Sequence, residues 1–135
     1  MKIAVIGSRE FDNYDLMCEH LDSLIAQTLH GDGKVSLLSG GAPGADSLAE
    51  VYAMQRDLEI EVIEADWDDL TQPDALIKTN RWGKKYDANA GKRRNTEIVR
   101  KADLVVAFHN GSPGTADSLA KARLMGKKII EVCFD

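Results

Sequence analysis

The chain has 135 residues, of which 44% are hydrophobic and 29% charged, and its formal net charge is −5. This composition is typical of a globular protein and too apolar for a disordered one, and the length predicts one domain over residues 1–135. Because an electrostatic grip on long nucleic acid normally needs a basic face, the acidic balance predicts that long nucleic acid is not the partner.

Cysteine usage and the N-terminus bear on the cellular compartment. Cys18 and Cys133 are far apart, which argues against a disulfide framework or a thiolate metal site, and no His or carboxylate spacing predicts a metal centre. The first apolar run is interrupted by Arg9 and Glu10, so it is too short for a signal peptide or a membrane span. We therefore expect a cytoplasmic protein with no membrane contact.

Strand and helix patterns alternate in the first half of the chain. Residues 2–7 form a β-branched, apolar run that is typical of a strand buried on both faces. Apolar positions at helical spacing then predict a helix over about 14–29. A strand over 35–38, a helix around 48–53 and a strand over 60–63 follow.

The second half resumes the alternation after an irregular stretch. Residues 66–92 contain Pro, Gly, both tryptophans and several basic residues, and we expect a long excursion with some helical turns there. The pattern then predicts a helix over about 94–101, a strand over 104–108, a helix that ends near 125 and a strand over 128–132.

This alternation predicts an α/β fold of Rossmann type, with three α/β/α layers and a mainly parallel five-stranded sheet. Numbering the five strands along the chain, we expect the order 3-2-1-4-5. In that order the chain reverses direction between the first and fourth strands, and ligands of such sheets bind in the crevice at the reversal. Residues 7–9 and the loops after the second and fourth strands should therefore face one cleft.

Two similar glycine-rich segments follow strands and open helices. They are GAPGADSLA at residues 41–49 and GSPGTADSLA at residues 111–120. Glycines allow tight turns, and the free amides and positive dipole end of a helix favour an anion, so together the segments predict a phosphate cradle. In the alternative interpretation the glycines only permit the turns, and Asp46 and Asp117 only complement helix dipoles. Neither segment is a Walker A loop or a GxGxxG dinucleotide motif.

Basic and aromatic residues supply further candidates. Arg9 follows the first strand, where its guanidinium could clamp a phosphate, although a solvated surface Arg is the alternative. The run at 91–95 places cations at a helix start, against the helix dipole, which is tolerable if an anion lies nearby. Trp82 and Tyr86 could stack on a base, as could Trp67, although each of them could instead pack the loop against the core.

In combination, these motifs resemble the YspA-like branch of the SLOG superfamily, which also includes LOG-type phosphoribohydrolases and DNA-processing proteins of the DprA type. The residues that carry the resemblance are Gly7-Ser8-Arg9 with Phe11, the run Gly40 to Asp46, Trp82-Gly83 leading to Ala90-Gly91 and Arg94-Asn95, and Gly114-Thr115. The resemblance spans nearly the whole chain. It implies a Rossmann-like fold and a nucleotide-type ligand, related to NAD or ADP-ribose in some members, and its relatives are often homodimers.

The resemblance also bears on catalysis. In LOG enzymes an Arg-Lys pair and a PGGxGTxxE motif support cleavage of a nucleotide N-glycosidic bond. Arg94 aligns with that Arg, but Asn95 replaces the Lys, and the Glu position falls on Ser118, with Asp117 one residue earlier. A carboxylate would have to stabilise the oxocarbenium-like transition state, so Asp117 and Asp46 are the candidates.

The sequence thus predicts binding of a nucleotide or nucleotide-derived ligand, as a sensor or a processing domain, and it indicates no particular cofactor besides this ligand. N-glycosidic hydrolysis is the alternative, with Asp117, Asp46 and Arg94 as catalytic residues, and single-stranded DNA binding is a weaker one. Trp82 is the expected base-stacking residue. The expected ligand-binding residues are Gly7, Ser8, Arg9, Gly40, Gly41, Ala42, Gly44, Asp46, Arg94, Asn95, Gly111, Ser112, Gly114 and Thr115.

Overall fold

A computed structural model describes residues 1–28 and 34–134. The elements are β1 (Lys2–Gly7), α1 (Tyr14–Thr28), β2 (Ser36–Ser39), α2 (Ala45–Gln55), β3 (Glu59–Val62), β4 (Ile77–Thr79), β5 (Lys85–Asp87), α3 (Ala90–Lys101), β6 (Leu104–His109), α4 (Pro113–Leu124) and β7 (Lys128–Cys133). The predicted end of the first helix at residue 29 lies outside the described residues.

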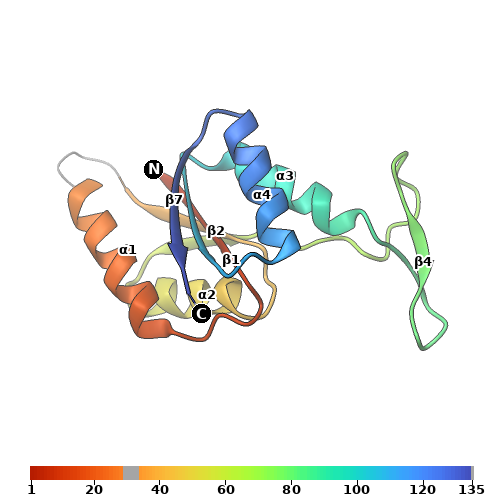
Figure 1. Ribbon diagram of the computed structural model, residues 1–135, viewed down its shortest axis with the longest axis horizontal. Coiled ribbons are helices and arrows are strands. Elements are labelled where there is room, and N and C mark those ends of the chain that lie inside the picture. The colour runs from red at the N-terminus through yellow and green to blue at the C-terminus, as the bar shows by residue number, and fades with distance from the viewer. Residues whose placement is uncertain (29–33, 135) are drawn as a thin grey trace.

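The main sheet has five strands in the order β3-β2-β1-β6-β7, and every neighbouring pair is parallel. This arrangement confirms the predicted fold class and the order 3-2-1-4-5, because β6 and β7 are the fourth and fifth strands of the sheet. Helices cover both faces (Figure 1). α1 and α2 pack on one face, and α3 and α4 pack on the other.

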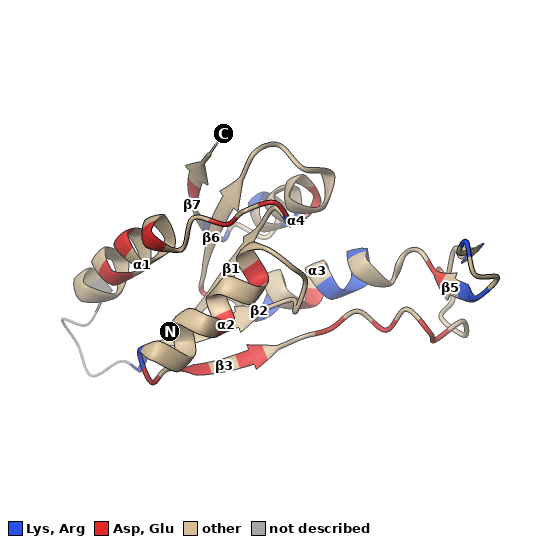
Figure 2. Ribbon diagram, turned by 90° about the horizontal axis from the view of Figure 1, so that it is seen from below, with Lys and Arg blue, Asp and Glu red and all other residues tan. Residues whose placement is uncertain are grey.

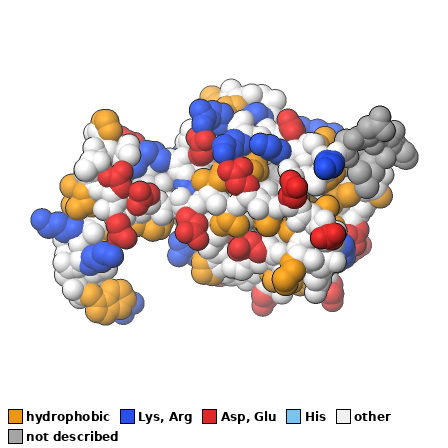
Figure 3. All heavy atoms as spheres, turned by 180° about the vertical axis from the view of Figure 1, so that it is seen from behind, with side chains coloured by type: hydrophobic (Ala, Val, Ile, Leu, Met, Phe, Trp, Pro, Cys, Tyr) orange, Lys and Arg blue, Asp and Glu red, His pale blue; other side chains and the backbone are white. Residues whose placement is uncertain are grey.

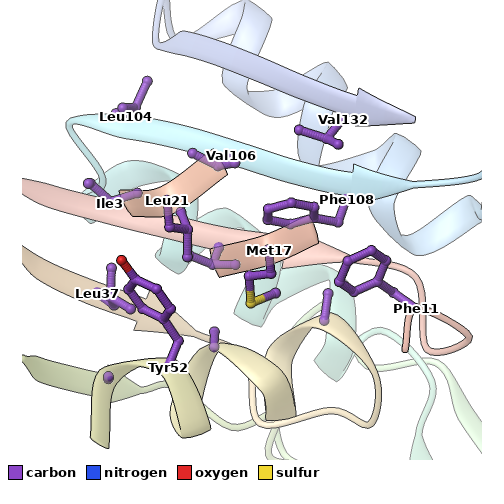
Figure 4. Packing of buried hydrophobic residues seen from close by; sticks show 14 of the residues in the cluster. Ile3, Phe11, Met17, Leu21, Leu37, Tyr52, Leu104, Val106, Phe108 and Val132 are labelled. Carbon is purple, nitrogen blue, oxygen red and sulfur yellow. The ribbon is translucent and has the colours of Figure 1, made fainter. Parts of the chain in front are cut away.

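The central strand β1 shows how the sequence builds the two cores. Because successive side chains of a strand point to opposite faces, Ile3 and Val5 enter the core beneath α1 and α2, whereas Ala4 and Ile6 face α3 and α4. All four side chains are buried. Figure 4 shows the first core, in which large side chains from both helices pack against side chains from β1, β2, β6 and β7. The continuous apolar run of β1 is therefore that of a strand covered on both sides.

The segment between β3 and α3 differs from the prediction of helical turns, because it contains an antiparallel hairpin of β4 and β5. The Asn80 side chain closes the turn, since its Oδ1 accepts hydrogen bonds from the amides of Trp82 (2.9 Å) and Lys84 (3.0 Å). Gly83 takes a positive φ of 80° there, which glycine tolerates without strain. The hairpin projects away from the main sheet (Figure 1). In addition, α3 begins at Ala90, before the predicted start near residue 94.

The outer strands of the sheet are β3 and β7. Both carry exposed charged side chains, Glu59 and Glu61 on β3 and Lys128 and Glu131 on β7. Within residues 1–28 and 34–134, no helix has both the length and the apolar character that crossing a membrane requires.

Candidate functional site

A cleft of about 330 Å³ lies where β1 and β6 end and where α4 begins. It brings together the three segments that the chain reversal predicts to meet, namely the turn after β1, the loop after β2 and the loop after β6. The predicted ligand-binding residues that line it are Gly7, Ser8, Arg9, Ala42, Asp46, Arg94, Asn95, Ser112, Gly114 and Thr115. Gly40, Gly41, Gly44 and Gly111 are not part of this lining.

The start of α4 presents open amides to the cleft. The first hydrogen bond of this turn runs from the Ala116 amide to the Ser112 carbonyl (3.0 Å), so the amides of Gly114 and Thr115 have no protein acceptor within the described part of the chain. A Cβ atom added to Gly114 would meet no atom within 4 Å. The free amides and the positive end of the helix dipole therefore form a site that favours an anion.

The start of α2 is different, although its sequence is almost the same. The Ala45 amide donates to the Ser8 carbonyl (3.2 Å), and the Ala42 amide donates to Asp46 Oδ2 (3.2 Å). The Gly41 amide donates to Ser39 Oγ (3.3 Å). The expectation that both glycine turns offer open amides therefore needs correction, because three amides of the turn before α2 already donate hydrogen bonds to protein atoms.

Gly44 is needed for packing between two loops. Its φ is +84°, and a Cβ atom there would lie 2.3 Å from the Ser8 carbonyl oxygen and 2.6 Å from the Arg9 backbone. Gly7 is equally confined, since its Cβ would lie 2.2 Å from the Phe108 carbonyl oxygen. These two glycines thus allow backbone segments of the protein to approach each other closely beside the cleft.

Asp46 and Arg94 form a charged pair of neighbours around Gly40. A Cβ atom on Gly40 would lie 2.8 Å from both Arg94 Nη1 and Asp46 Oδ2, so a side chain there would require one of these two groups to shift. Arg94 Nη1 donates to the Gly40 carbonyl (2.6 Å), and Arg94 Nε donates to Asn95 Oδ1 (3.0 Å). These contacts fix the guanidinium at the edge of the cleft.

Burial shifts the pKa values of both groups. It raises the pKa of Asp46 to about 6, although the Ala42 amide and the charge of Arg94 oppose the shift. It lowers the pKa of the Arg94 guanidinium; Asp46 opposes that shift, and the positive charge of Arg9 adds to it. Arg9 itself is exposed, and it makes no ion pair with any described residue. Two guanidinium groups therefore lie near one another at this cleft.

The two candidate catalytic carboxylates have different positions. Asp46 is 8% exposed and lines the cleft. Asp117 is not part of the lining, and its Oδ2 instead accepts hydrogen bonds from Lys121 Nζ (2.8 Å) and Asn95 Nδ2 (3.2 Å). Of the two carboxylates, only Asp46 therefore borders the cleft.

The two tryptophans also differ in position. Trp82 lies in the hairpin turn and is 77% exposed. It lines neither the cleft nor the two smaller hollows that adjoin the cleft. Trp67 lines an adjoining hollow of about 240 Å³ together with Glu64, and this hollow shares Arg9, Ala42 and Arg94 with the cleft. The predicted set leaves out Trp67, although its position directly after β3, at the carboxyl edge of the sheet, is the signal that points to it.

The fold and the cleft define a Rossmann-like α/β protein with an anion-favouring helix start at the reversal of its parallel sheet. Residues 1–69, just over half of the chain, match the model of the YspA, cpYpsA-related SLOG family. The chain belongs to this family, which confirms the resemblance inferred from the sequence. No curated protein matched the chain.

Two solved structures share the fold. DNA processing protein A from Streptococcus pneumoniae has a TM-score of 0.69 and 19% identity, over 99% of this chain and 50% of that chain. DNA processing protein A from Helicobacter pylori, studied for its single-stranded DNA binding mode, has a TM-score of 0.66 and 16% identity, over 97% of this chain and 64% of that chain. The chain therefore spans only about half to two thirds of these proteins, and at such identities the likeness establishes the fold alone.

One expectation about partners is corrected by this comparison. The acidic net charge predicts that long nucleic acid is not a partner, yet the same fold occurs in a protein with a described single-stranded DNA binding mode. A net charge averages over the whole surface, whereas binding depends on where the cations gather. The overall acidity of this chain therefore does not exclude nucleic acid.

Proposed function

We propose that the cleft binds the phosphate group of a nucleotide or nucleotide derivative. The observation that carries this proposal is the arrangement of open amides at Gly114 and Thr115 around the same cleft as two guanidinium groups, Arg9 and Arg94. Backbone amides at a helix start and arginine side chains are the donors that most often hold phosphate in proteins.

The two arginines would have different roles. Arg94 is held by the Gly40 carbonyl and by Asn95, so it is preorganised and loses little freedom when a phosphate arrives. Arg9 is exposed and free of ion pairs with the described residues, so it can close over the ligand. One fixed and one mobile cation together suit a charged ligand that enters from solvent.

The hollow beside the cleft offers a place for the base or the second sugar of the ligand. Trp67 supplies an aromatic surface, and the Glu64 carboxylate can accept hydrogen bonds from hydroxyl or amino groups. Because Arg9 and Arg94 border both spaces, a ligand that extends through both would keep its phosphates near the guanidinium groups. Dinucleotide-like ligands such as NAD and ADP-ribose have this extended form.

Isothermal titration calorimetry with AMP, ADP-ribose, NAD and inorganic phosphate tests the proposal. We expect binding of at least one nucleotide, weakened by Gly114→Val and Arg9→Ala, with inorganic phosphate as a weak competitor. Lys128→Ala is the matched control, because it removes an exposed cation at the start of β7, beside Leu104 and at the opposite end of the strands from the cleft. Absence of heat with all four ligands, or equal affinities in all variants, would contradict the proposal.

Single-stranded DNA is the second candidate ligand, and the shared fold with the Helicobacter pylori protein favours it. A strand would place one of its phosphates at the same amides and guanidinium groups. The two candidates are separated by competition. If ADP-ribose displaces an oligonucleotide from the wild-type protein and Gly114→Val weakens the binding of both ligands, the cleft binds both. If Gly114→Val weakens only the binding of ADP-ribose, the strand does not use the cleft.

Hydrolysis of the N-glycosidic bond is a further possibility that the position of Asp46 supports. A buried carboxyl group with a pKa of about 6 can exchange a proton near neutral pH, as a general acid or base must. Chromatography after incubation with nucleoside monophosphates and NAD would detect a released base. Release that is abolished by Asp46→Asn and retained by Asp117→Asn would establish hydrolysis, whereas ligands recovered unchanged would leave binding as the function.

A further inference from the structure

The β4–β5 hairpin carries a concentration of positive charge, whereas the segment that leads to it from β3 carries acidic residues (Figure 2). Residues 75–86 contain four cations, Lys78, Arg81, Lys84 and Lys85, and no carboxylate, whereas the whole chain has a net charge of −5. All four side chains are exposed. Only Lys84 is paired among the described residues, with Asp68 (3.0 Å). The other three charges are therefore available to a partner.

The hairpin stands off the rest of the molecule. In Figure 3 it forms a separate lobe that carries both blue cationic and red acidic side chains, with an orange group and blue side chains at its far end. β4 and β5 hydrogen-bond only to each other in the described sheets. A two-stranded hairpin is marginally stable by itself in water, so the way in which its base is fixed becomes important.

The base of the hairpin is held firmly. The Asp87 carboxylate is fully buried and pairs with Arg93, while its Oδ1 accepts hydrogen bonds from the amides of Leu76 (3.0 Å) and Asn89 (2.9 Å). The Asp87 amide donates to the Trp67 carbonyl (2.8 Å). The hairpin is thus a fixed projection whose tip is presented to solvent.

The tip carries an exposed indole in a defined position. Trp82 is 77% exposed, although tryptophan is among the most buried residue types on average. The Asn80 side chain holds its amide (2.9 Å), and the Arg81 guanidinium lies over its ring, 4.7 Å from the ring centroid. An indole with a cation beside it matches the stacking platforms that bind unpaired bases.

We propose that this hairpin is a contact site for single-stranded nucleic acid, separate from the nucleotide cleft. Trp82 stacks on an unpaired base, and Lys78, Arg81 and Lys85 contact the phosphates on either side. Both the charge and the aromatic surface are required by this chemistry, since cations alone attract any polyanion and an aromatic ring alone gives no affinity for phosphate. The site extends the protein's nucleic-acid contacts beyond the proposed cleft and does not depend on it.

Fluorescence anisotropy with a labelled oligothymidylate of about 20 nucleotides tests the site in the 135-residue chain. We expect Trp82→Ala to weaken binding by about tenfold and Trp82→Phe to retain most of the affinity, because phenylalanine still stacks. A Lys78→Ala, Arg81→Ala, Lys85→Ala variant should also lose affinity and show a smaller salt dependence between about 50 and 200 mM salt. The matched control removes three exposed cations from the body, Lys2, Lys34 and Lys128.

Four outcomes would overturn the proposal. The first three are no oligonucleotide binding by the wild type, equal losses in the hairpin and control variants, and equal affinity for a duplex of the same length. A fourth is a wild-type dimer that the hairpin variants dissociate while oligonucleotide affinity stays constant, which would assign the hairpin to self-association. Because Gly114→Val blocks the cleft and Trp82→Ala does not, loss of one site leaves the other measurable. Oligonucleotide binding that survives Gly114→Val would support the hairpin even if the cleft proposal fails.

Discussion

Arg93 and Arg94 are neighbours in the first part of α3, yet their guanidinium groups serve different regions of the molecule. Arg93 pairs with the buried Asp87 at the base of the hairpin, and Arg94 donates to the Gly40 carbonyl (2.6 Å) at the cleft. One turn of helix therefore fixes both proposed contact sites.

Substitution of the two cleft arginines should have separable effects. We expect Arg9→Ala to weaken nucleotide binding by about 1.5–3 kcal/mol, the range for charge-assisted hydrogen bonds, with no change in the free energy of unfolding. Arg94→Ala should weaken binding similarly and also lower stability, because the Gly40 carbonyl loses its donor. Calorimetric titration and urea unfolding measure the two effects. A stability loss in Arg9→Ala as large as that in Arg94→Ala would show that Arg9 is structural.

The two glycine turns should respond differently to the same substitution. Gly114→Val should abolish ligand binding and change stability by less than about 1 kcal/mol, since its side chain would enter open space. Gly44→Val should destabilise the fold by about 2–4 kcal/mol, because its Cβ would clash with the Ser8 carbonyl at a positive φ. Denaturant unfolding beside ligand titration compares the pair, and a strongly destabilised Gly114→Val would be at odds with the open amide site.

Asp46 should make stability fall as pH rises through a defined window. Between its ordinary value of 3.8 and the folded value of about 6, the folded state keeps a proton that the unfolded state has released. The cost of the buried charge is therefore absent at low pH and complete above about pH 7, where it amounts to at most about 3 kcal/mol.

Asp46→Asn removes this titration while its Oδ1 can still accept the Ala42 amide. The stability of Asp46→Asn relative to wild type should increase from pH 4 to pH 7 in a series of urea unfolding curves, with Asp117→Asn as the control. Curves for wild type and Asp46→Asn that run parallel across this range would refute the raised pKa.

The Asp87–Arg93 contact should control the order of the hairpin. Asp87→Ala leaves a partly buried guanidinium without its main partner and frees the amides of Leu76 and Asn89, so we expect a loss of about 3–5 kcal/mol, as for other broken buried pairs. Relative to the wild type, Asp87→Ala should accelerate hydrogen exchange more in residues 76–87 than in β1. Uniform protection of both regions in the variant would contradict this role.

The main sheet was predictable because the residue pattern within each strand or helix is enough to indicate that element. Strands such as β1 and β6 are continuous apolar runs, and α1 carries apolar residues at helical spacing. The hairpin was not predictable in the same way, since β4 and β5 have only three residues each and are mostly exposed. Such strands have no buried face to produce a pattern, and the Asn80 side chain that closes the turn acts through contacts that spacing does not reveal.

The site was predictable in location but not in detail. The position of the cleft follows from strand order, and strand order follows from the alternation of elements. The difference between the two glycine turns depends on Ser8, whose carbonyl reaches the Ala45 amide from a distant part of the sequence. By contrast, the pairing of Asp117 with Lys121 was within reach, because residues four apart share a helix face.

The charged outer strands of the sheet have a consequence for how copies of this protein can meet. An unpaired strand edge is a template for another chain, and exposed charges are one means by which proteins prevent such pairing. β3 displays Glu59 and Glu61, and Glu131 on β7 contacts Arg123 (3.1 Å). Pairing of β3 with the β3 of a second copy would bring the glutamates of both copies together, which opposes growth of the sheet through this edge.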